Sequence, residues 1–362
     1  METTTTTLPH LPHELMIQIL LWLPVKSLIR FKSVCKSWFS LISTDSQFAK
    51  SHFQLSAATH TRRVLLISTS AFESIDLEAS LHDDSAFASL DFDFLPIGSY
   101  SDLQIKGSCR GFILLHCSLS FYIWNPSTGF HKKIPLSPFE CDSDKECEYF
   151  YGFGYDSSTD DYLVVSMSAH LHTCHLEIFS LRANTWRQIQ GPHCMYAHAS
   201  EHELKPGLFF NGAIYWLAFR LDLLKHVILA YDLIERKFFH MAVPYKLKHT
   251  PYDCGLWVFG EFLGLWVHHV AAEIWVMKVH KVHLSWTRTH VFPFDGIQHP
   301  FSPLCSAKKG HIIGTDDPNR LVRYNHGGKL LECSSYYNES YGPKVAVYTE
   351  SLLSLPGDNQ QA

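Results

Sequence analysis

Histidine and cysteine side chains that alternate along one stretch are the first candidates for chemistry in this sequence. His170, His172 and Cys174 are separated by single residues, so in a strand they would share one face and approach a zinc ion together. Their spacing is not that of a known structural zinc site, and no fourth ligand with a matching signature is present. The pairs His268-His269 and His193-Cys194 are weaker still. Since 24 histidines occur in 362 residues, chance clusters are expected, and we predict no metal site and no cofactor.

The motifs of common hydrolases and nucleotide-binding enzymes are missing from the sequence. It contains no Gly-x-Ser-x-Gly, no Gly-x-x-x-x-Gly-Lys-Ser/Thr and no His-Glu-x-x-His segment. It also contains no Cys-x-x-Cys pair, which excludes a zinc RING on this chain. The sequence therefore predicts a protein that is not an enzyme and has no catalytic residues.

Composition and charge narrow the class of protein further. The chain has 30 Lys and Arg against 35 Asp and Glu, a formal net charge of -5, which argues against nucleic acid or an anionic membrane as a partner. No apolar run reaches the length of a membrane span, and the first residues lack the features of a secretory signal. Ten irregularly spaced cysteines then indicate reduced thiols. We expect a location in the cytoplasm, the nucleus or both.

The N-terminal segment carries more apolar surface than a unit of its length can bury in itself. Leu15, Ile19, Leu20 and Leu23 follow helical spacing, and Pro24 ends that helix and can begin the next. Two further apolar stripes predict a second and a third short helix; these are Leu28, Phe31 and Val34, and then Trp38, Leu41 and Ile42. Helices this short need a partner surface, so this segment is expected to dock on another protein.

These residues stand in an order that resembles a known motif. The segment LPHELMIQILLWLPVKSLIRFKSVCKSWFSLI, within residues 8–53, is similar to an F-box, the adaptor-binding motif of Skp-cullin-F-box ubiquitin ligases. The resemblance implies a set of residues that either contact a Skp-type adaptor or hold the helices that do. They are Leu11, Pro12, Leu15, Ile19, Leu20, Leu23, Pro24, Leu28, Val34, Cys35, Lys36 and Trp38. A purely structural role is the alternative for each of them.

A basic patch lies within the same segment. Lys26, Arg30, Lys32 and Lys36 occur between Pro24 and Trp38 with no acidic residue among them. Such a patch favours an acidic protein partner through complementary potential. The alternative is a solvated helix face, and four charges are too few to indicate nucleic acid.

From residue 105 onward the chain repeats with a period near fifty. Apolar strands begin at Gly111, Asp161, Gly212, Gly260 and Gly310, and each is followed by a second strand, a turn and a return strand. Short strands rich in β-branched and aromatic residues at this period predict blades of a β-propeller. Five units are visible, and a sixth can be assembled from residues 64–67 and 345–348, which would close the ring and remove exposed edges.

The repeats resemble the F-box-associated, kelch-like domain found behind many plant F-boxes. The phrases WNPSTG, FGYDSSTDDYLVV, LEIFSLRANTWRQI and FFNGAIYW carry the resemblance, which covers residues 64–349. The fold class is therefore α+β and multidomain, with a small N-terminal helical F-box followed by an all-β kelch-like propeller. Residues 70–104 are interpreted as a surface insertion, with an irregular first blade as the alternative, and residues 1–7 and 356–362 as flexible tails.

Aromatic residues in the propeller loops are the candidates for contact with a substrate, because exposed aromatics anchor interfaces. They are Tyr149, Phe150, Tyr151, Tyr196, Tyr245, Tyr252 and Trp257, with ordinary loop packing as the alternative. The function implied by the resemblance is a noncatalytic substrate-recognition subunit, with a Skp-type adaptor, a cullin reached through it, and an unknown substrate protein as partners. Two alternatives stay open. One is a propeller that binds a small molecule or carbohydrate, and the other is an adaptor-binding protein that acts outside ubiquitin ligases.

Overall fold

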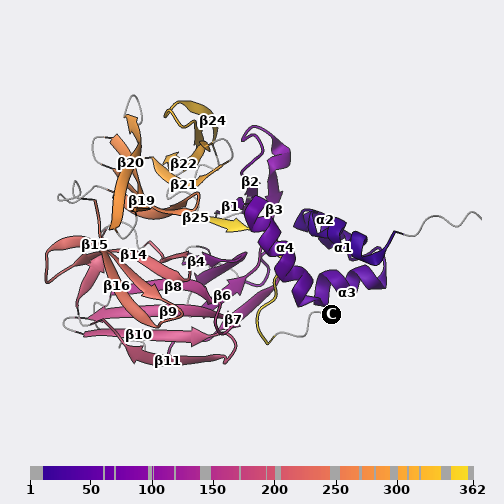
Figure 1. The fold of residues 1–362 in the computed structure, drawn as a ribbon, viewed down its shortest axis with the longest axis horizontal. Coiled ribbons are helices and arrows are strands. Elements are labelled where there is room, and N and C mark those ends of the chain that lie inside the picture. Colours follow the sequence, from indigo (N-terminus) through magenta and orange to yellow (C-terminus); the bar gives the residue numbers. More distant parts are fainter. Residues whose placement is uncertain are drawn as a thin grey trace, which may run out of the picture.

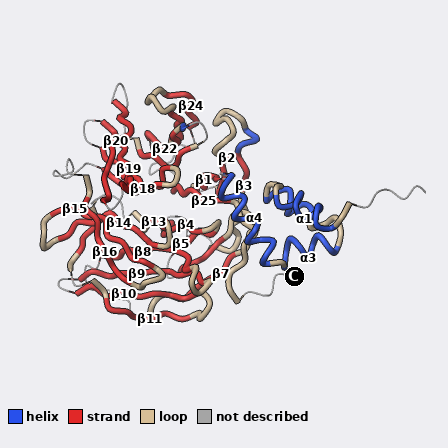
Figure 2. Tube along the Cα trace, viewed as in Figure 1, coloured by secondary structure: helices blue, strands red, loops and turns tan. Residues whose placement is uncertain are grey.

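The computed structural model of the protein describes most of the chain. The described residues are 11–59, 62–68, 71–96, 100, 102–117, 120–138, 148–170, 173–192, 194–199, 205–244, 253–268, 271–280, 283–293, 301–307, 310–317, 319–335 and 344–357. Helices occupy the N-terminal part and strands almost all of the rest (Figures 1 and 2). No helix among these residues is long and apolar enough to cross a membrane.

Four helices form the N-terminal part, where the apolar spacing predicts three. They are α1 (His13–Leu21), α2 (Val25–Phe31), α3 (Lys36–Thr44) and α4 (Ser46–Thr59). Pro12 and Pro24 stand immediately before α1 and α2, where a proline fixes a favourable backbone angle. The unpredicted helix α4 begins after Asp45, whose carboxylate accepts hydrogen bonds from the backbone N–H groups of Gln47 and Phe48, both at 2.9 Å.

Six antiparallel sheets follow, and they are the blades of a propeller. Blade 1 contains β4 (Gln104–Cys109), β5 (Phe112–Cys117), β6 (Ser120–Trp124) and β7 (His131–Ile134), and blade 2 contains β8 (Glu148–Asp156), β9 (Asp161–His170), β10 (Thr173–Ser180) and β11 (Thr185–Gln190). Blade 3 contains β12 (Tyr196–His198), β13 (Leu208–Phe210), β14 (Ala213–Arg220), β15 (Lys225–Asp232) and β16 (Lys237–Ala242). Blade 4 contains β17 (Asp253–Phe259), β18 (Phe262–His268), β19 (Ala271–His280) and β20 (His283–Pro293). Blade 5 contains β21 (Ser302–Ser306), β22 (Ile312–Asp317), β23 (Arg320–Tyr324) and β24 (Leu330–Ser335).

The sixth blade joins the two ends of the propeller. It contains β1 (Arg62–Ile67), β2 (Phe72–Asp76), β3 (Phe87–Ser89) and the last strand of the chain, β25 (Lys344–Thr349). Val64 pairs with Val347 across the seam, and the Tyr348 hydroxyl lies 2.7 Å from Ser74 Oγ. The predicted closure is confirmed. The interpretation of residues 70–104 as an insertion is wrong, because β2 and β3 from this segment are strands of blade 6.

Tight turns between the first and second strands explain the repeated glycines. In the turn Arg110-Gly111 the φ angles are 50° and 86°, and in Asn211-Gly212 they are 45° and 79°. Positive φ at both central residues defines the type I′ hairpin turn, which favours glycine. At Gly111 the need is also steric, since an added Cβ would lie 2.2 Å from Ser351 Cβ.

Aromatic side chains pack the blades against one another. Trp124, Phe179, Tyr231 and Tyr324 are all buried in the propeller core. Two other tryptophans join the outer edges of neighbouring blades. Trp186 Nε1 of blade 2 donates to Pro135 O beyond β7 at 2.9 Å, and Trp286 Nε1 of blade 4 donates to Ala242 O of blade 3 at 2.8 Å.

The helices and the propeller share one hydrophobic core. Leu28 and Phe48 from the helices cluster with Phe112 and Phe153 from blades 1 and 2. The chain after β25 contributes Leu352, Leu353 and Leu355 to the same cluster. Polar contacts border it: Lys50 Nζ on α4 lies 2.9 Å from Asp160 Oδ2 in blade 2, and the Arg110 guanidinium lies 5.1 Å from the ring centroid of Phe53. Helix α4 therefore joins the helical unit to the propeller (Figure 1).

Candidate functional site

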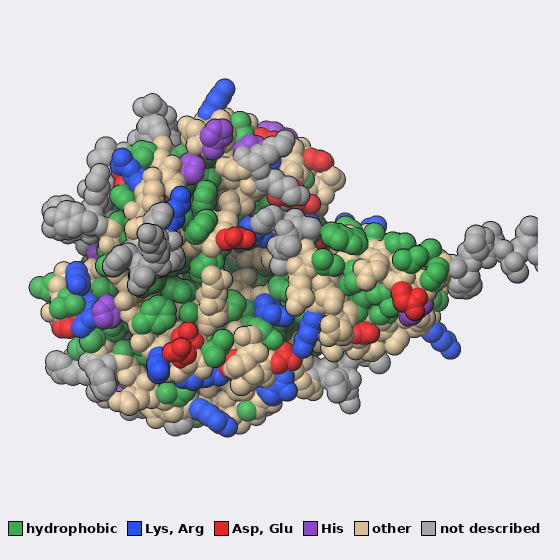
Figure 3. Space-filling model, in the orientation of Figure 1, with side chains coloured by type: hydrophobic (Ala, Val, Ile, Leu, Met, Phe, Trp, Pro, Cys, Tyr) green, Lys and Arg blue, Asp and Glu red, His purple; other side chains and the backbone are tan. Residues whose placement is uncertain are grey.

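An apolar surface on the helices is left uncovered by the propeller. Leu15, Ile19 and Trp22 have 52%, 53% and 65% of their surface exposed, and their i, i+4, i+7 spacing places them on one face of α1. Leu11 before α1 and Val34 before α3 are exposed as well. We call these five residues the helical face. Hydrophobic side chains gather on the helical lobe that projects from the propeller (Figure 3).

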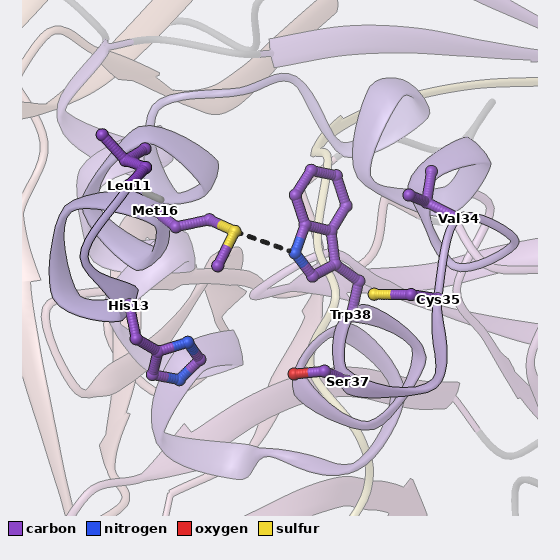
Figure 4. Close-up of a pocket in the computed structure, with 7 residues that line it drawn as sticks. All are labelled: Leu11, His13, Met16, Val34, Cys35, Ser37 and Trp38. Carbon is purple, nitrogen blue, oxygen red and sulfur yellow. Dashed lines mark hydrogen bonds between the residues drawn. The ribbon is translucent and has the colours of Figure 1, made fainter. Parts of the chain in front are cut away.

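A pocket opens between the start of α1 and the start of α3 (Figure 4). It has a volume of about 460 Å³ and is lined by Leu11, His13, Met16, Val34, Cys35, Ser37 and Trp38. Trp38 Nε1 donates a hydrogen bond to Met16 Sδ at 3.2 Å, and the Trp38 ring lies 5.3 Å from that of Phe31. Because Trp38 links α1, α2 and α3, it sets the floor of this pocket and the distance between the helices.

The structure divides the predicted adaptor-binding residues into two groups. The exposed group can meet a partner directly, and it consists of Leu11, Pro12, Leu15, Ile19, Pro24, Val34, Cys35 and Lys36. Leu23 and Trp38 are half-buried. Leu20 and Leu28 have 1% and 0% of their surface exposed, so for these two the structural alternative holds: they support the helices and touch no partner.

The basic patch belongs to the same helical unit as the helical face. Lys26, Arg30 and Lys36 are exposed, whereas Lys32 is half-buried, and its partial burial lowers its pKa. Helix α1 contains one acidic residue, Glu14, and it is exposed. The helical unit thus offers both exposed apolar side chains and exposed positive charges, a combination that suits a partner with apolar and acidic residues.

Two exposed aromatic residues on the helical unit are additional candidates that the sequence pattern did not single out. Trp22 lies three residues after Ile19 on the same helix face, and Phe39 lies on α3 with 43% of its surface exposed. Helical spacing extended by one step from Leu15 and Ile19 identifies Trp22. No comparable pattern identifies Phe39.

Most of the predicted substrate-contact aromatics are core residues. Phe150, Tyr151, Tyr196 and Trp257 lie within strands and are buried, so the expectation that they are exposed on loops is wrong. Both faces of a blade are covered, so Phe150 and Tyr151 enter two different hydrophobic clusters on opposite faces of β8. Tyr149 is half-buried. The remaining two, Tyr245 and Tyr252, lie outside the described residues.

Of the predicted metal-binding candidates His170, His172 and Cys174, the structure describes only the side chain of Cys174. Cys174 Sγ donates a hydrogen bond to Cys194 O at 3.3 Å. The side chain of His170 and the whole of His172 lie outside the described residues. Within the described part of the chain, no group of three or more His, Cys, Asp or Glu side chains is placed to hold a metal ion.

A central cavity runs through the propeller. Its volume is about 1390 Å³, and it is lined chiefly by β4, β17, β21, β25 and the segment 205–211. These are the inner edges of the blades. The cavity is larger than typical small-molecule pockets, and both apolar and charged side chains line it.

Two histidines, the buried His52 on α4 and the half-buried His116 on β5, should make the stability of the fold pH-dependent. Burial lowers the pKa of His52, which lies 2.8 Å from Leu23 O. Burial and then the nearby Lys106 charge lower the pKa of His116 to about 4. The unfolded chain therefore binds more protons than the folded chain below pH 6.5.

We expect the free energy of unfolding to be highest above about pH 7 and to fall as the pH is lowered from 6.5 toward 4. Urea unfolding at a series of pH values measures this. In His116→Phe, which keeps a ring against Phe121, part of this loss should disappear. Substitution of the exposed His82 by Phe is the control and should leave the pH dependence as it is. An unchanged slope in His116→Phe would contradict the assignment.

Comparison with known proteins agrees with this architecture. A family model described as F-box-like matches residues 8–54, and one described as F-box associated beta propeller domain matches residues 63–355. The chain is 32% identical to the F-box/kelch-repeat protein At3g23880 of Arabidopsis thaliana, over 97% of each chain. It is 24% identical to the F-box protein At2g43440 of the same plant, over 95% of this chain and 84% of the relative.

The four helices and the six-bladed propeller define a class of protein in which an F-box precedes a kelch-like propeller. This chain belongs to the F-box proteins that carry an F-box associated beta propeller domain. An F-box followed by a β-propeller is the organisation of an F-box substrate-recognition protein. F-box proteins are typically noncatalytic adaptor subunits, and the F-box implies a Skp-type adaptor as partner.

Proposed function

We propose that this protein is the substrate-recognition subunit of a Skp-cullin-F-box ubiquitin ligase. The observation that carries the proposal is the helical face, in which Leu15, Ile19 and Trp22 stay exposed although the same helices bury their other side in the propeller core. Burying one large apolar side chain gains about 1.5–3 kcal/mol. Binding of a partner that covers this face is therefore favoured by the burial of these side chains, which remain in contact with water in the chain alone.

The basic patch supports an acidic adaptor. Lys26, Arg30 and Lys36 are exposed on the same helical unit, where they would speed and orient association with a partner of opposite charge. Exposed ion pairs add little affinity. We expect the apolar side chains to supply most of the binding energy and the charges to supply the dependence on salt.

The mechanism in this proposal is proximity. The propeller holds a substrate protein, the F-box binds the adaptor, and the adaptor binds a cullin that brings the ubiquitin-charged enzyme. Holding a lysine of the substrate near the ubiquitin-carrying enzyme replaces a bimolecular encounter by a local one. The core shared by α4 and blades 1 and 2 supports this role, since a firm junction keeps the substrate at a constant distance from the adaptor.

Assembly of the complex is the test. We expect the intact chain to co-migrate with a Skp-type adaptor and a cullin in size-exclusion chromatography. Leu15→Asp and Trp22→Asp, alone and together, should lose both partners while keeping the unfolding temperature of the intact protein, because both side chains are exposed. Leu224→Asp is the matched control, since Leu224 is also an exposed leucine but lies on the β14–β15 turn.

The outcomes separate the hypotheses. Loss of both partners in the helical-face variants but not in Leu224→Asp supports the proposal. Binding of the adaptor without the cullin would contradict the ligase role and favour an adaptor-binding protein that acts outside ubiquitin ligases. Failure of the folded intact chain to bind any Skp-type adaptor would overturn the assignment of the helical face.

The central cavity favours a second function for the propeller, the binding of a small molecule or carbohydrate, either alone or together with substrate recognition. The cavity has a volume of about 1390 Å³, which is large enough to admit such a ligand. We also propose a location in the cytoplasm, the nucleus or both. The eight cysteines within the described residues are free thiols, which fits a reducing compartment. Fluorescent tagging of the intact chain in plant cells tests the location.

A further inference from the structure

Two cysteines that are separated by 20 positions in the sequence come together at the boundary between blades 2 and 3. Cys174 is the second residue of β10 in blade 2, and Cys194 lies in the connection to blade 3, two residues before β12. Cys174 Sγ donates a hydrogen bond to Cys194 O at 3.3 Å. Both residues are half-buried free thiols, so small polar molecules in the solvent can reach them.

The connection between the blades crosses directly over Cys174. A Cβ added at Gly191 would lie 2.2 Å from Cys174 O and 3.4 Å from Cys174 Cβ, so only glycine permits this close approach. Because a carbonyl oxygen lies about 2.4 Å from its own Cα, the hydrogen bond places Cys174 Sγ within about 6 Å of Cys194 Cα. The two sulfur atoms therefore come within reach of each other when Cys194 turns its side chain toward Cys174.

A shared neighbour shows that the two thiol groups face the same space. Tyr196 is 4% exposed, and its side chain interacts with the Cys194 thiol. Burial raises the pKa of Cys174, a hydrogen bond with the backbone of Tyr196 lowers it in part, and the charge of a Cys194 thiolate raises it again. An effect of one thiolate on the other requires that the sulfur atoms lie near each other.

A guanidinium group lies near Cys194. Arg220 on β14 pairs in register with Tyr196, and its charge interacts with Cys194. Asp222 takes up part of that charge through two contacts of 2.8 Å with Arg220. A positive charge favours a thiolate, which is the form of cysteine that reacts with oxidants. Cys194 is thus placed to react first, whereas the raised pKa of Cys174 keeps that residue as a thiol until it reacts in turn.

Both cysteines lie at the end of blade 2 that is remote from the F-box. Ser180, at the other end of β10, donates a hydrogen bond to Asp161, and the neighbouring Asp160 pairs with Lys50 on α4. Cys174 is at the opposite end of the same strand. A reaction at this pair therefore leaves the helical face unchanged.

We propose that Cys174 and Cys194 form a reversible disulfide when the protein meets hydrogen peroxide. The Cys194 thiolate attacks one peroxide oxygen, the O–O bond breaks, and a sulfenic acid forms while the other oxygen leaves as hydroxide and becomes water. Cys174 Sγ then attacks the sulfenic sulfur, the S–S bond forms, and hydroxide leaves with the Cys174 proton as a second water. The two thiols lose two electrons and the peroxide gains them. A small dithiol reductant reverses the reaction by thiol–disulfide exchange.

The disulfide changes how blades 2 and 3 are joined. It closes a loop that contains β11, the outer strand of blade 2, and it fixes the connection that enters blade 3. A cross-link restricts the unfolded chain more than the folded one, so the oxidised protein should unfold at a higher temperature. In a reducing compartment such a bond is a transient response to oxidant. It does not depend on the proposed ligase role.

Peptide mapping of the full-length protein tests the bond. The reduced protein, purified with its adaptor if the adaptor is required, is treated at pH 7 with a few equivalents of hydrogen peroxide, blocked with iodoacetamide and digested with trypsin. Because trypsin cleaves after Arg182 and Arg187, Cys174 and Cys194 fall in different peptides unless a disulfide joins them. We expect the joined pair in the oxidised sample, and its loss after treatment with dithiothreitol.

Three variants locate the reaction. Cys174→Ser and Cys194→Ser should each lose the joined peptides and the rise in unfolding temperature. In Cys174→Ser the sulfenic acid at Cys194 should persist and react with dimedone, whereas in Cys194→Ser the remaining Cys174 should stay reduced at the same dose. Cys333→Ser is the control, because Cys333 is also a half-buried thiol but lies on β24 in blade 5. It should behave like the intact protein.

The exposed Cys35 reports whether the peroxide dose was effective. Joined peptides in the intact protein and in Cys333→Ser, but in neither of the other variants, support the proposal. Their absence from folded protein in which Cys35 is already oxidised overturns it, as does cross-linking that occurs equally among other cysteines. Untreated Cys174→Ser and Cys194→Ser should bind the adaptor as the intact protein does, so failure of the disulfide is distinguished from failure of the ligase role.

Discussion

Removal of the last nineteen residues, by truncation after Pro343, is expected to prevent the propeller from folding. The truncation deletes β25, which pairs with β1 along the whole seam from Arg62↔Thr349 to Ile67↔Lys344. Blade 6 then keeps only β1, β2 and β3, and the inner edge of β1 is exposed. Unpaired edge strands cost backbone hydrogen bonds and promote aggregation.

The same truncation also removes part of the junction with the F-box. Leu352, Leu353 and Leu355 are buried in the cluster that contains helix and blade residues, and loss of one large buried side chain typically costs about 2–5 kcal/mol. Together these losses exceed the stability of about 5–15 kcal/mol that a typical domain has. We expect aggregated or unfolded protein, seen as loss of the cooperative thermal transition in circular dichroism.

Two shorter truncations separate the contributions. Truncation after Gly357 removes none of the buried leucines and should leave the unfolding temperature unchanged. Truncation after Glu350 keeps β25 but removes the three leucines, and should lower the unfolding temperature clearly but less than truncation after Pro343. A cooperative transition at the original temperature after truncation at Pro343 would show that the seam does not close the fold.

The architecture of the blades could be predicted from the sequence because its strongest signals come from turns. The turn Arg110-Gly111 and its counterpart Asn211-Gly212 need positive φ angles, and this need recurs at a regular interval. The strands after these turns are buried and apolar, as in Phe112–Cys117. Closure through residues 64–67 and 345–348 was predictable for a different reason, since an open ring leaves two edges.

The innermost strands of blades 1 to 5 were not predicted, and the reason lies in their position. Gln104–Cys109 and Ser302–Ser306 line the central cavity along one edge, so they carry polar and small residues and lack the apolar pattern of the other strands. Residues 70–104 are a related case, because β3 has only three residues and no buried side chain. Short, polar or bulged strands follow tertiary context more than local pattern.

The prediction that aromatic residues of the propeller are exposed for substrate contact was wrong because a local pattern was given too much weight. Phe150 and Tyr151 lie next to an acidic stretch that suggests a loop, yet they belong to β8 and are buried between blades. Composition indicates that an aromatic residue is present without indicating which way it points. The contact between Cys174 and Cys194 was equally hidden, because it depends on the path of the connection between blades 2 and 3.

Adjacent residues of α1 give the sharpest test of the adaptor-binding surface. Ile19 has 53% of its surface exposed and its neighbour Leu20 has 1%, so one residue can contact a partner and the other cannot. We expect Ile19→Ala to leave the free energy of unfolding within about 0.5 kcal/mol of the intact protein. It should weaken adaptor binding by about 2 kcal/mol, roughly thirtyfold, as a side chain at the centre of an interface does.

Leu20→Ala should behave in the reverse way. Leu20 packs in the cluster shared with the propeller, so its truncation should lower the free energy of unfolding by about 2–5 kcal/mol. The fraction that stays folded should bind the adaptor with nearly normal affinity. Urea unfolding gives the first quantity, and calorimetric titration of the adaptor well below the unfolding temperature gives the second.

The comparison of the two variants decides between an interface and a structural role for the exposed side of α1. If both variants lose stability and neither loses affinity, α1 serves only the core, and the adaptor binds elsewhere. If affinity falls in Ile19→Ala alone, the partner covers the same side as Leu15 and Trp22, which share its face. Because the two residues are consecutive, a general disturbance of the helix would affect both variants alike and cannot produce opposite results.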